Sequence, residues 1–157
     1  IDEMLERGTV LVPTLSVLNQ IPEVGRASQE KIDRKLWWRD AGMRNIARAV
    51  AAGVPIVTGT DAGIVPHGTN LAELGYLVEL GMTPLQAIHA GTLVGARTTG
   101  LDDRLGSVEA GKLADLVLTS ADPLKSIGAL ADATTVRAVW QSGRLVKDLD
   151  HLGTLAR

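Results

Sequence analysis

The sequence predicts an α/β fold, because two short apolar runs are separated by one long helical pattern. Residues 9–12 (TVLV) form a run rich in β-branched side chains that ends at Pro13, and residues 55–58 (PIVT) form a second run. Both runs are apolar throughout, which is typical of parallel strands covered on both faces. A strand, a helical crossover and a second strand make a βαβ unit, the repeating unit of parallel α/β folds and of the (β/α)8 barrel.

Helix-start and helix-stop signals divide the rest of the first hundred residues. The connecting helix begins at Ser28, a favourable N-cap, and ends before Gly53. Two later helices start at patterns typical of capping boxes, NLAE at 70–73 and TPLQ at 83–86. The second of them is expected to break at residues 91–92 and then resume.

After the last of these helices the pattern becomes strand-forming. Residues 113–119 predict a strand, and residues 136–141 and 144–147 predict a hairpin around a tight turn. The chain therefore divides into residues 1–100, with the parallel strands and helices, and residues 101–157, a small β segment. A complete barrel needs about 250 residues. The two parallel strands belong either to a small open sheet or to the end of a barrel.

Composition excludes several classes of protein. The 157 residues are 45% apolar, with no Phe, so the core is expected to be aliphatic. A net charge of −2 and dispersed basic residues argue against a nucleic-acid-binding face, and the absence of Cys excludes disulfides and thiolate metal sites. No apolar run is long enough to span a membrane, and no signal peptide is visible, which favours the cytoplasm. The chain opens on Ile1 rather than Met, so we expect it to be part of a longer protein.

Asp61 is the strongest candidate for chemistry. It stands in TGTDAG (58–63), directly after the second apolar run. This position is the carboxyl edge of the predicted sheet, where α/β proteins build active sites. A carboxylate there can ligate a divalent metal ion and accept a proton from water. The competing interpretation is that Asp61 only caps its own loop by bonding backbone amides.

Three histidines and two tryptophans are the remaining candidates. His67 follows in the same loop, where it could touch substrate, act as an acid or base, or support a metal ligand; otherwise it is a surface imidazole. His89 lies inside a helix and is expected to be packed or solvated, and His151 near the terminus is expected to be incidental. Trp37 and Trp38 are adjacent on the long helix and cannot share a face. We expect one to be packed and the other to contact a partner or a further part of the protein.

Common catalytic motifs are absent from the sequence. It contains no GxGxxG, P-loop, HExxH or GxSxG pattern. Zinc sites normally use three or four protein ligands, and no second His or carboxylate is placed to complete a site around Asp61. The chain alone is therefore expected to bind zinc weakly or not at all.

Longer stretches resemble the amidohydrolase superfamily. GVPIVTGTDAG (53–63) followed by PHGTNLAELGYLVELGMTPLQAIHAGT (66–92) resembles the last barrel strand and the helices after it. LGSVEAGKLADLVLTSADPL (105–124) followed by VRAVWQSGRLV (136–146) resembles the return segment of the small β-sandwich domain. The Gly–Lys–x–Ala–Asp pattern is the most specific part. The chain is most similar to the imidazolonepropionase-like and prolidase-like branch.

This resemblance implies the C-terminal part of a (β/α)8 barrel, with residues 9–12 as its seventh strand and 55–58 as its eighth, plus the return strands of a β-sandwich. It implies one or two divalent ions, usually zinc, in the complete protein. Asp61 would ligate metal and carry the proton of the attacking water to the leaving amine. The other ligands of the family, an HxH pair, a carboxylated Lys or a Glu, and two further His, have no counterpart here. Lys112 and Asp115 are implied to be turn and strand-start residues.

We therefore expect a parent enzyme that hydrolyses C–N bonds of cyclic or peptide-like amides, and an isolated chain without this activity. Its partner would be a small amide or dipeptide-like substrate rather than nucleic acid or a membrane. Two alternatives stay open: a structural or interaction module without chemistry, and a deaminase of the same superfamily. Because the parallel runs are apolar on both faces and one helix covers only one face, the chain alone is expected to self-associate or to bind the N-terminal part of the same protein.

Overall fold

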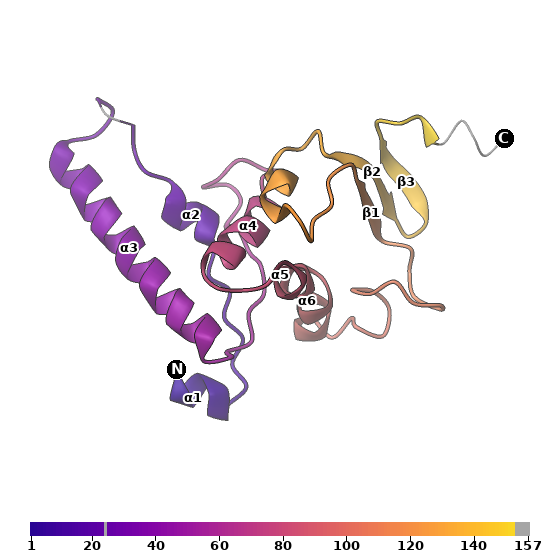
Figure 1. Cartoon of the computed structure of the whole chain (residues 1–157), viewed down its shortest axis with the longest axis horizontal. Coiled ribbons are helices and arrows are strands. Elements are labelled where there is room, and N and C mark those ends of the chain that lie inside the picture. Colours follow the sequence, from indigo (N-terminus) through magenta and orange to yellow (C-terminus); the bar gives the residue numbers. More distant parts are fainter. Residues whose placement is uncertain (24, 153–157) are drawn as a thin grey trace.

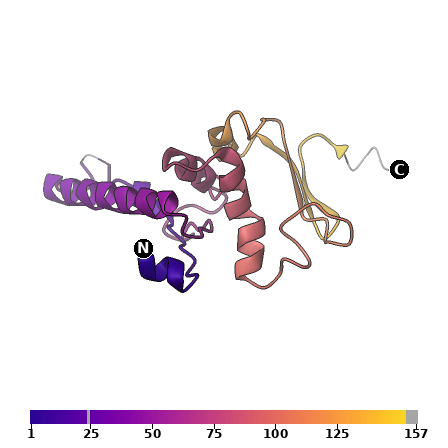
Figure 2. The same ribbon diagram turned by 60° about the horizontal axis from the view of Figure 1, so that its bottom comes forward.

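The computed structural model describes residues 1–23 and 25–152. The molecule is elongated, with a long helix at one end, shorter helices in the middle and a small sheet at the other end (Figures 1 and 2). The helices are α1 (Asp2–Glu6), α2 (Leu15–Asn19), α3 (Gln29–Ala51), α4 (Ala72–Glu79), α5 (Pro84–Gly91), α6 (Leu93–Thr98) and the 3-10 helix η1 (Ile127–Ala131). The strands are β1 (Leu116–Thr119), β2 (Val136–Gln141) and β3 (Arg144–Asp148). None of the helices within the described ranges is long and apolar enough to cross a membrane.

The two apolar runs near the N-terminus lie side by side and parallel, as the sequence predicts. They meet in one bridge between Leu11 and Ile56. The N–H of Leu11 donates to the carbonyl of Pro55 at 2.9 Å, and the N–H of Val57 donates to the carbonyl of Leu11 at 3.0 Å. The prediction of two full strands is wrong, because no described strand pairs with the outer edge of either run and a single bridge does not extend into a ladder.

The long helix α3 has both predicted ends. The Ser28 hydroxyl accepts the N–H of Lys31 at 3.4 Å, and Gly53 follows the helix with a left-handed φ of +81°. Aliphatic side chains on one face of α3 pack against the core: Met43, Ile46 and Val50. Packing of this face on the core places the end of α3 next to the start of the second parallel run.

Both tryptophans of α3 lie outside the core. Trp37 is 68% exposed and Trp38 is 53% exposed, and the ammonium of Lys35 lies 4.8 Å from the ring centre of Trp38. The expectation that one of them is packed is wrong. Smaller aliphatic side chains already fill the inward face of α3. By helix periodicity Trp37 lies on the opposite face, and Trp38 lies on the side between the two faces.

Helix α5 begins with the capping box that the sequence predicts, whereas α4 does not. The Thr83 hydroxyl accepts the N–H of Gln86, and the Gln86 side chain accepts the N–H of Thr83 at 2.8 Å, which is a complete capping box. The capping box predicted from Asn70 is wrong. Helix α4 begins at Ala72 without a side-chain cap, because the carboxylate of Glu73 bonds to α2 instead.

The core lies where α2, α4, α5 and η1 meet. Its buried residues are aliphatic, as the absence of Phe predicts: Leu15, Leu18, Ile56, Leu74, Leu77, Ala87, Ala90, Ile127 and Leu130. Ile56 belongs to the second parallel run, so this run packs against the core through the Ile56 side chain. The main-chain direction just before Asp61 is therefore fixed by buried apolar contacts.

The C-terminal segment forms one antiparallel sheet in the order β1-β2-β3. The predicted hairpin is confirmed: Ser142 and Gly143 turn the chain at φ +50° and +78°, the left-handed pair that two-residue hairpins need. The predicted strand at 113–119 is shorter, since β1 begins at Leu116. A sandwich needs a second sheet, and within the described residues this sheet is a single layer.

Candidate functional site

The two parallel runs end at a common edge, and the chain leaves this edge through strained backbone. Thr14 follows the first run with φ +47°, and Asp61 follows the second with φ +53°. Left-handed backbone is unfavourable for residues other than Gly, by about 1–2 kcal/mol. Such positions cluster at functional sites. The carboxyl ends of the two parallel runs, where the sequence predicts the site, are therefore also the place where the backbone is strained.

The Asp61 loop is held by its main chain. The carbonyl of Asp61 accepts the N–H of Ile64 at 3.1 Å, and the N–H of Gly63 donates to the carbonyl of Val65 at 3.0 Å. Val65 is buried, which anchors the far side of the turn. The Asp61 side chain is exposed and makes no hydrogen bond or ion pair to any described residue. The interpretation of Asp61 as a carboxylate cap of its own loop is thus not what the geometry shows.

His67 lies further along the same exposed loop. Its neighbour Gly68 turns the backbone at φ +86°, and the hydroxyl of Thr69 donates to the carbonyl of Pro66 at 2.8 Å. These two features fold the loop tightly around an exposed imidazole. No hydrogen bond links His67 to Asp61 within the described residues, so the structure leaves both side chains available without joining them.

The parallel runs approach closely at the base of this edge. A Cβ atom on Gly59 would lie 2.5 Å from Cγ1 of Val12, well inside van der Waals contact. Glycine is therefore needed for close packing two residues before Asp61. The first glycine of TGTDAG therefore sets how closely the two runs approach just before Asp61.

Glu73 is the site residue that sequence reasoning missed. Its side chain is 0% exposed, and its carboxylate accepts the N–H groups of Leu15 at 3.0 Å and Ser16 at 2.5 Å. It thereby joins α4, which follows the Asp61 loop, to α2, which follows Thr14. A signal was present in the sequence, because Glu73 lies four residues before the buried Leu77 and so shares its apolar helix face.

A complete metal site is not formed by the described residues, in which no three His, Asp or Glu side chains come together. Asp61 fits such a site as a single oxygen ligand with a free carboxylate. His89 is exposed on α5 and does not approach the Asp61 loop through any hydrogen bond, in keeping with a solvated helix histidine.

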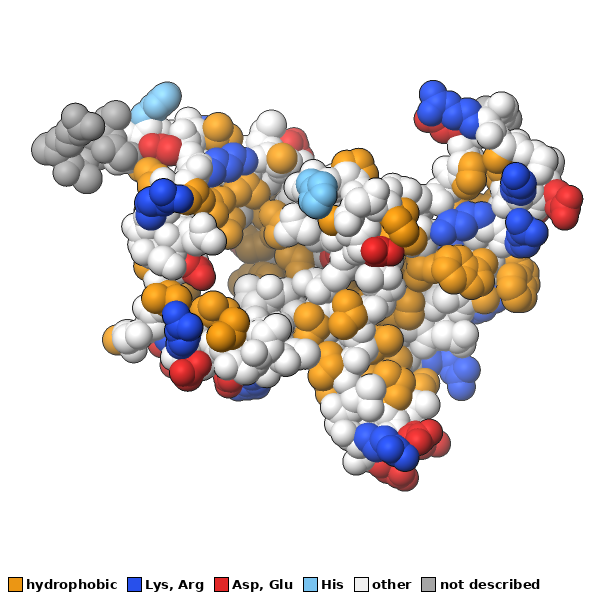
Figure 3. Space-filling view, turned by 180° about the vertical axis from the view of Figure 1, so that it is seen from behind, with side chains coloured by type: hydrophobic (Ala, Val, Ile, Leu, Met, Phe, Trp, Pro, Cys, Tyr) orange, Lys and Arg blue, Asp and Glu red, His pale blue; other side chains and the backbone are white. Residues whose placement is uncertain are grey.

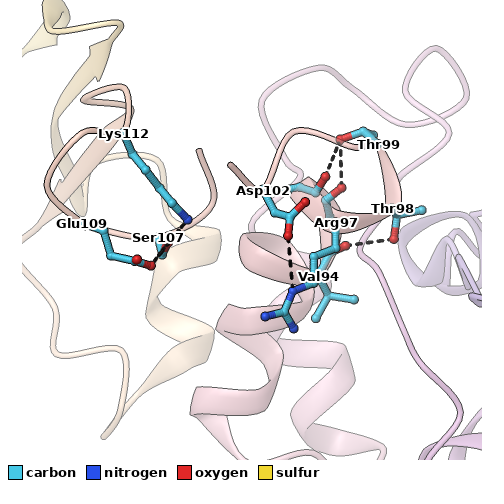
Figure 4. Close-up of polar contacts among 10 residues, drawn as sticks. Val94, Arg97, Thr98, Thr99, Asp102, Ser107, Glu109 and Lys112 are labelled. Atoms are coloured by element: carbon cyan, nitrogen blue, oxygen red, sulfur yellow. Dashed lines mark hydrogen bonds and ion pairs between the residues drawn. The ribbon is translucent and has the colours of Figure 1, made fainter. Parts of the chain in front are cut away.

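Lys112 and Asp115 have the structural roles that the resemblance implies. The ammonium of Lys112 donates to the hydroxyl of Ser107 at 2.6 Å, and Ser107 in turn donates to Glu109 (Figure 4). The hydrogen bond from Ser107 and the charge of Lys112 lower the pKa of Glu109. Asp115, just before β1, accepts the N–H of Ser142 at 2.6 Å and so fixes the hairpin turn. These contacts stabilise turns in the β segment.

Two large hollows open on the surface. One, of about 640 Å³, lies between α4, α5, α6 and β1, and is visible as an apolar depression in Figure 3. The other, of about 720 Å³, lies between α1 and the C-terminal half of α3. Neither Asp61 nor His67 lines them. The hollow of about 640 Å³ nevertheless reaches this edge, because Thr58 at the end of the second parallel run and Asn70 after the His67 loop both line it.

Comparison with known proteins extends these observations. An uncharacterised protein of Mycobacterium tuberculosis is 37% identical over 134 residues, which cover 81% of this chain and 34% of that protein. The imidazolonepropionase of Thermoplasma volcanium is 32% identical over 101 residues, covering 63% of this chain and 25% of that enzyme. The crystal structure of a Xaa-Pro dipeptidase with bound methionine superposes with a TM-score of 0.82 at 35% identity, over 93% of this chain and 36% of that one.

The chain thus spans about a third or less of the length of these relatives. The family model for the amidohydrolase family matches residues 1–146, a range that includes the parallel runs, the Asp61 loop and nearly all of the three-stranded sheet. Since that match covers most of the sequence, the chain belongs to the amidohydrolase family.

Proposed function

We propose that this chain is the C-terminal part of a metal-dependent hydrolase that cleaves C–N bonds, and that Asp61 is its catalytic carboxylate. The observation that supports the proposal most directly is the combination of a constrained main chain and an exposed side chain at Asp61. Its main chain is held in a strained turn by the Ile64 hydrogen bond, while its carboxylate is exposed and unpartnered within the described residues. A carboxylate held in this way is preorganised for a ligand or a proton.

Asp61 can carry a proton in both halves of an amide hydrolysis. It first accepts the proton of the attacking water, and it then delivers this proton to the departing nitrogen, which leaves as an amine. The C–N bond breaks as the new C–O bond is completed, so the products are a carboxylic acid and an amine. His67, in the same exposed loop, is the second group that could hold substrate or a proton there.

A divalent ion, zinc in the first instance, would supply Lewis acidity and a more acidic water at this edge. Asp61 would be one ligand of that ion, and the remaining ligands would come from the part of the protein upstream of this chain. The donor set supports this division, because the described residues bring no three suitable side chains together. The isolated chain is therefore expected to be inactive.

The remainder of the parent would also complete the fold. We infer that residues 9–12 and 55–58 become full strands of a (β/α)8 barrel when further strands pair with their outer edges. The free edge of β1 and the two hollows would be covered at the same time. Residues 101–157 would then be the return segment of a small β domain.

The relatives that this chain resembles support a choice of substrates to test. A Xaa-Pro dipeptidase and an imidazolonepropionase both act on C–N bonds, so dipeptides and cyclic amides are the substrates to test. The parent protein, purified with zinc, would be assayed against a panel of Xaa-Pro dipeptides and cyclic amides. Release of free amino acids or ring opening supports the proposal.

Two results would contradict it. Release of ammonia from an amino-substituted ring, without hydrolysis of any amide, would assign a deaminase instead. If the enzyme kept its full activity after a chelator had removed the metal, the hydrolysis would not use a divalent ion. The matched control is the same chelator treatment followed by addition of zinc, which should restore turnover.

A further inference from the structure

Thr14, at the end of the first parallel run, has a backbone conformation that is rare for its residue type. Its φ of +47° is left-handed, and a β-branched residue in that region is an outlier. Glycine would adopt the same backbone without strain, so the turn into α2 does not itself require a side chain at this position. Strain of this kind is typical of residues whose side chains have a function.

The Thr14 hydroxyl does not cap the helix that Thr14 begins. Thr14 is the N-cap residue of α2, where a threonine normally accepts a backbone N–H from the first turn, but its side chain makes no such bond. The buried carboxylate of Glu73 on α4 accepts the N–H groups of Leu15 and Ser16 instead (Figure 1). Within the described residues the Thr14 hydroxyl has no hydrogen-bond partner. The start of α2 is therefore satisfied without Thr14, whose hydroxyl is free to bind another group.

The Thr14 side chain lies at the edge that also holds Asp61. Its methyl carbon would be 3.7 Å from a Cβ atom on Gly59, so it lies against the second run two residues before Asp61. Val12 lies against the same glycine and is 48% exposed, whereas Leu11 packs on the core. Because side chains alternate along an extended chain, Val12 and Thr14 share the side of the first run that the core leaves open.

We propose that Thr14 is a substrate-binding residue of the hydrolase, whose hydroxyl donates a hydrogen bond to a carbonyl or carboxylate oxygen of the amide substrate. This inference rests on the proposed function, since it needs a substrate beside Asp61. A hydroxyl without a protein partner binds substrate without first breaking a bond within the protein, and its constrained backbone limits the entropy lost on binding. Each parallel run then ends in a left-handed residue with an available polar side chain, Asp61 for the proton and Thr14 for the substrate.

Two other hydroxyl groups near this edge also lack a hydrogen-bond partner among the described residues. The Oγ atom of Ser16 is fully buried, so a substrate could not reach it. Thr60 stands next to Asp61, but its backbone is not left-handed. Only at Thr14 does a half-buried hydroxyl combine with a strained backbone and with a distant carboxylate that takes over its capping role.

Kinetics of the full-length parent, purified with zinc, test the proposal. Thr14→Val keeps the β-branched shape but removes the hydroxyl, so KM should rise by about fivefold to tenfold while kcat falls by less than about threefold. Thr14→Ser keeps the hydroxyl and should hold KM within about twofold. Thr98→Val is the matched control, because the hydroxyl of Thr98 on α6 already donates to the carbonyl of Val94. It should leave both constants within about twofold.

Thermal stability separates a binding role from a structural one. Thr14→Gly removes the side chain together with its backbone strain, so the melting temperature of the parent should not fall. KM should nevertheless rise as it does in Thr14→Val. A Thr14→Gly protein that melts at a lower temperature and keeps the unmodified KM would show that the side chain supports the fold, and the proposal would be overturned.

Failure of this proposal can be told apart from failure of the proposed function. If the parent cleaves C–N bonds and Thr14→Val keeps the unmodified KM, the proposed function stands and the assignment of Thr14 is overturned. A larger rise in KM from Thr60→Val than from Thr14→Val also overturns it. For a compound that is bound but not cleaved, the dissociation constant from titration calorimetry replaces KM in the same comparison. A parent that binds and cleaves none of the Xaa-Pro dipeptides and cyclic amides overturns both proposals.

Discussion

The carboxylate of Glu73 on α4 accepts the backbone N–H of Ser16 at 2.5 Å, although 57 residues separate the two in sequence. The same carboxylate accepts the N–H of Leu15 at 3.0 Å, and the side chain is fully buried. One acidic group thus satisfies two otherwise unpaired donors at the start of α2. It ties the segment after the first parallel run to the helix after the Asp61 loop.

Substitution of Glu73 should therefore destabilise the fold strongly. Glu73→Gln puts an amide donor where one carboxylate oxygen accepts, and we expect a loss of about 2 kcal/mol in the free energy of unfolding. Glu73→Ala leaves two buried N–H groups unpaired, for which we expect about 3–5 kcal/mol. Urea unfolding followed by circular dichroism measures both values.

Glu79→Gln is the matched control for Glu73, because Glu79 is an exposed glutamate on the same helix. It should change the free energy of unfolding by less than about 0.5 kcal/mol. If Glu73→Gln were equally mild, the two hydrogen bonds would not contribute to stability and the proposed tie between α4 and α2 would be wrong.

Gly59 should be intolerant of any side chain. The added methyl group of Gly59→Ala would lie 2.5 Å from Cγ1 of Val12, whose β-branched side chain has few alternative rotamers. We expect a loss of about 1–3 kcal/mol, the range for overpacking. At Gly128 an added Cβ meets no atom within 4 Å, so Gly128→Ala is the control and should be near neutral. Thermal melts of the two variants would separate crowding from a general effect of glycine replacement.

Acid should loosen the C-terminal hairpin through Asp150. The hydrogen bond from Arg137 lowers the pKa of Asp150, and the charges of Arg137 and His151 add to this against the opposing effect of desolvation. A lowered pKa in the folded state gives stability that is present above the unfolded pKa of about 3.9 and is lost as the pH falls through the folded value.

The pH dependence can be checked by urea unfolding at pH 5 and pH 3. Asp150→Asn should reduce the loss of stability between these two pH values, because the titrating partner of Arg137 is gone. Asp103→Asn, an exposed carboxylate outside the ion pairs of the described residues, should leave the pH dependence unchanged. An identical acid response in Asp150→Asn and the unmodified chain would contradict the assignment.

Local signals predicted the elements whose contacts are local. The capping box of Thr83 and Gln86 and the turn at Ser142 and Gly143 each involve residues within a few positions of one another, and the structure has both. The parallel runs were predicted too long, because a strand ladder depends on neighbours distant in sequence. Trp37 and Trp38 were misjudged for the same reason, since their exposure depends on which face of α3 meets the core.

The candidate site shows the same difference between local contacts, which the sequence predicted, and long-range contacts, which it did not. Strand-end position placed Asp61 at the edge of the parallel runs, and the structure shows it there. Glu73 was misread as a local cap with Asn70, because the sequence cannot show that N–H groups at Leu15 and Ser16 compete for the carboxylate. An acid on an apolar helix face is a signal for a distant partner, but it does not identify that partner.

Metal retention by the isolated chain should be weak. Asp61 is a single ligand, and stable zinc sites use three or four. After dialysis against buffer, purified chain loaded with zinc should retain it well below one equivalent, as measured by atomic absorption. Stoichiometric retention that disappears in Asp61→Asn would show that the chain supplies a complete site by itself.

Asp61→Asn in the full-length parent is the direct test of the catalytic assignment. Asparagine keeps the shape of the side chain but cannot accept the water proton, and its neutral oxygen binds a cation less strongly. Because Asp61 makes no hydrogen bond to a described residue, the substitution should leave folding intact. We expect kcat to fall by at least about a hundredfold, the lower range for a positioned general base.

Metal analysis must accompany the kinetics, since loss of the ion and loss of the proton carrier both lower kcat. If the Asp61→Asn protein keeps its zinc and still loses turnover, the carboxylate acts on the proton. If zinc is lost and added zinc restores the rate, Asp61 acts mainly as a ligand. His89→Asn, an exposed helix position, is the control and should retain turnover within about twofold. Near-normal turnover of Asp61→Asn with zinc bound would exclude Asp61 as the catalytic carboxylate.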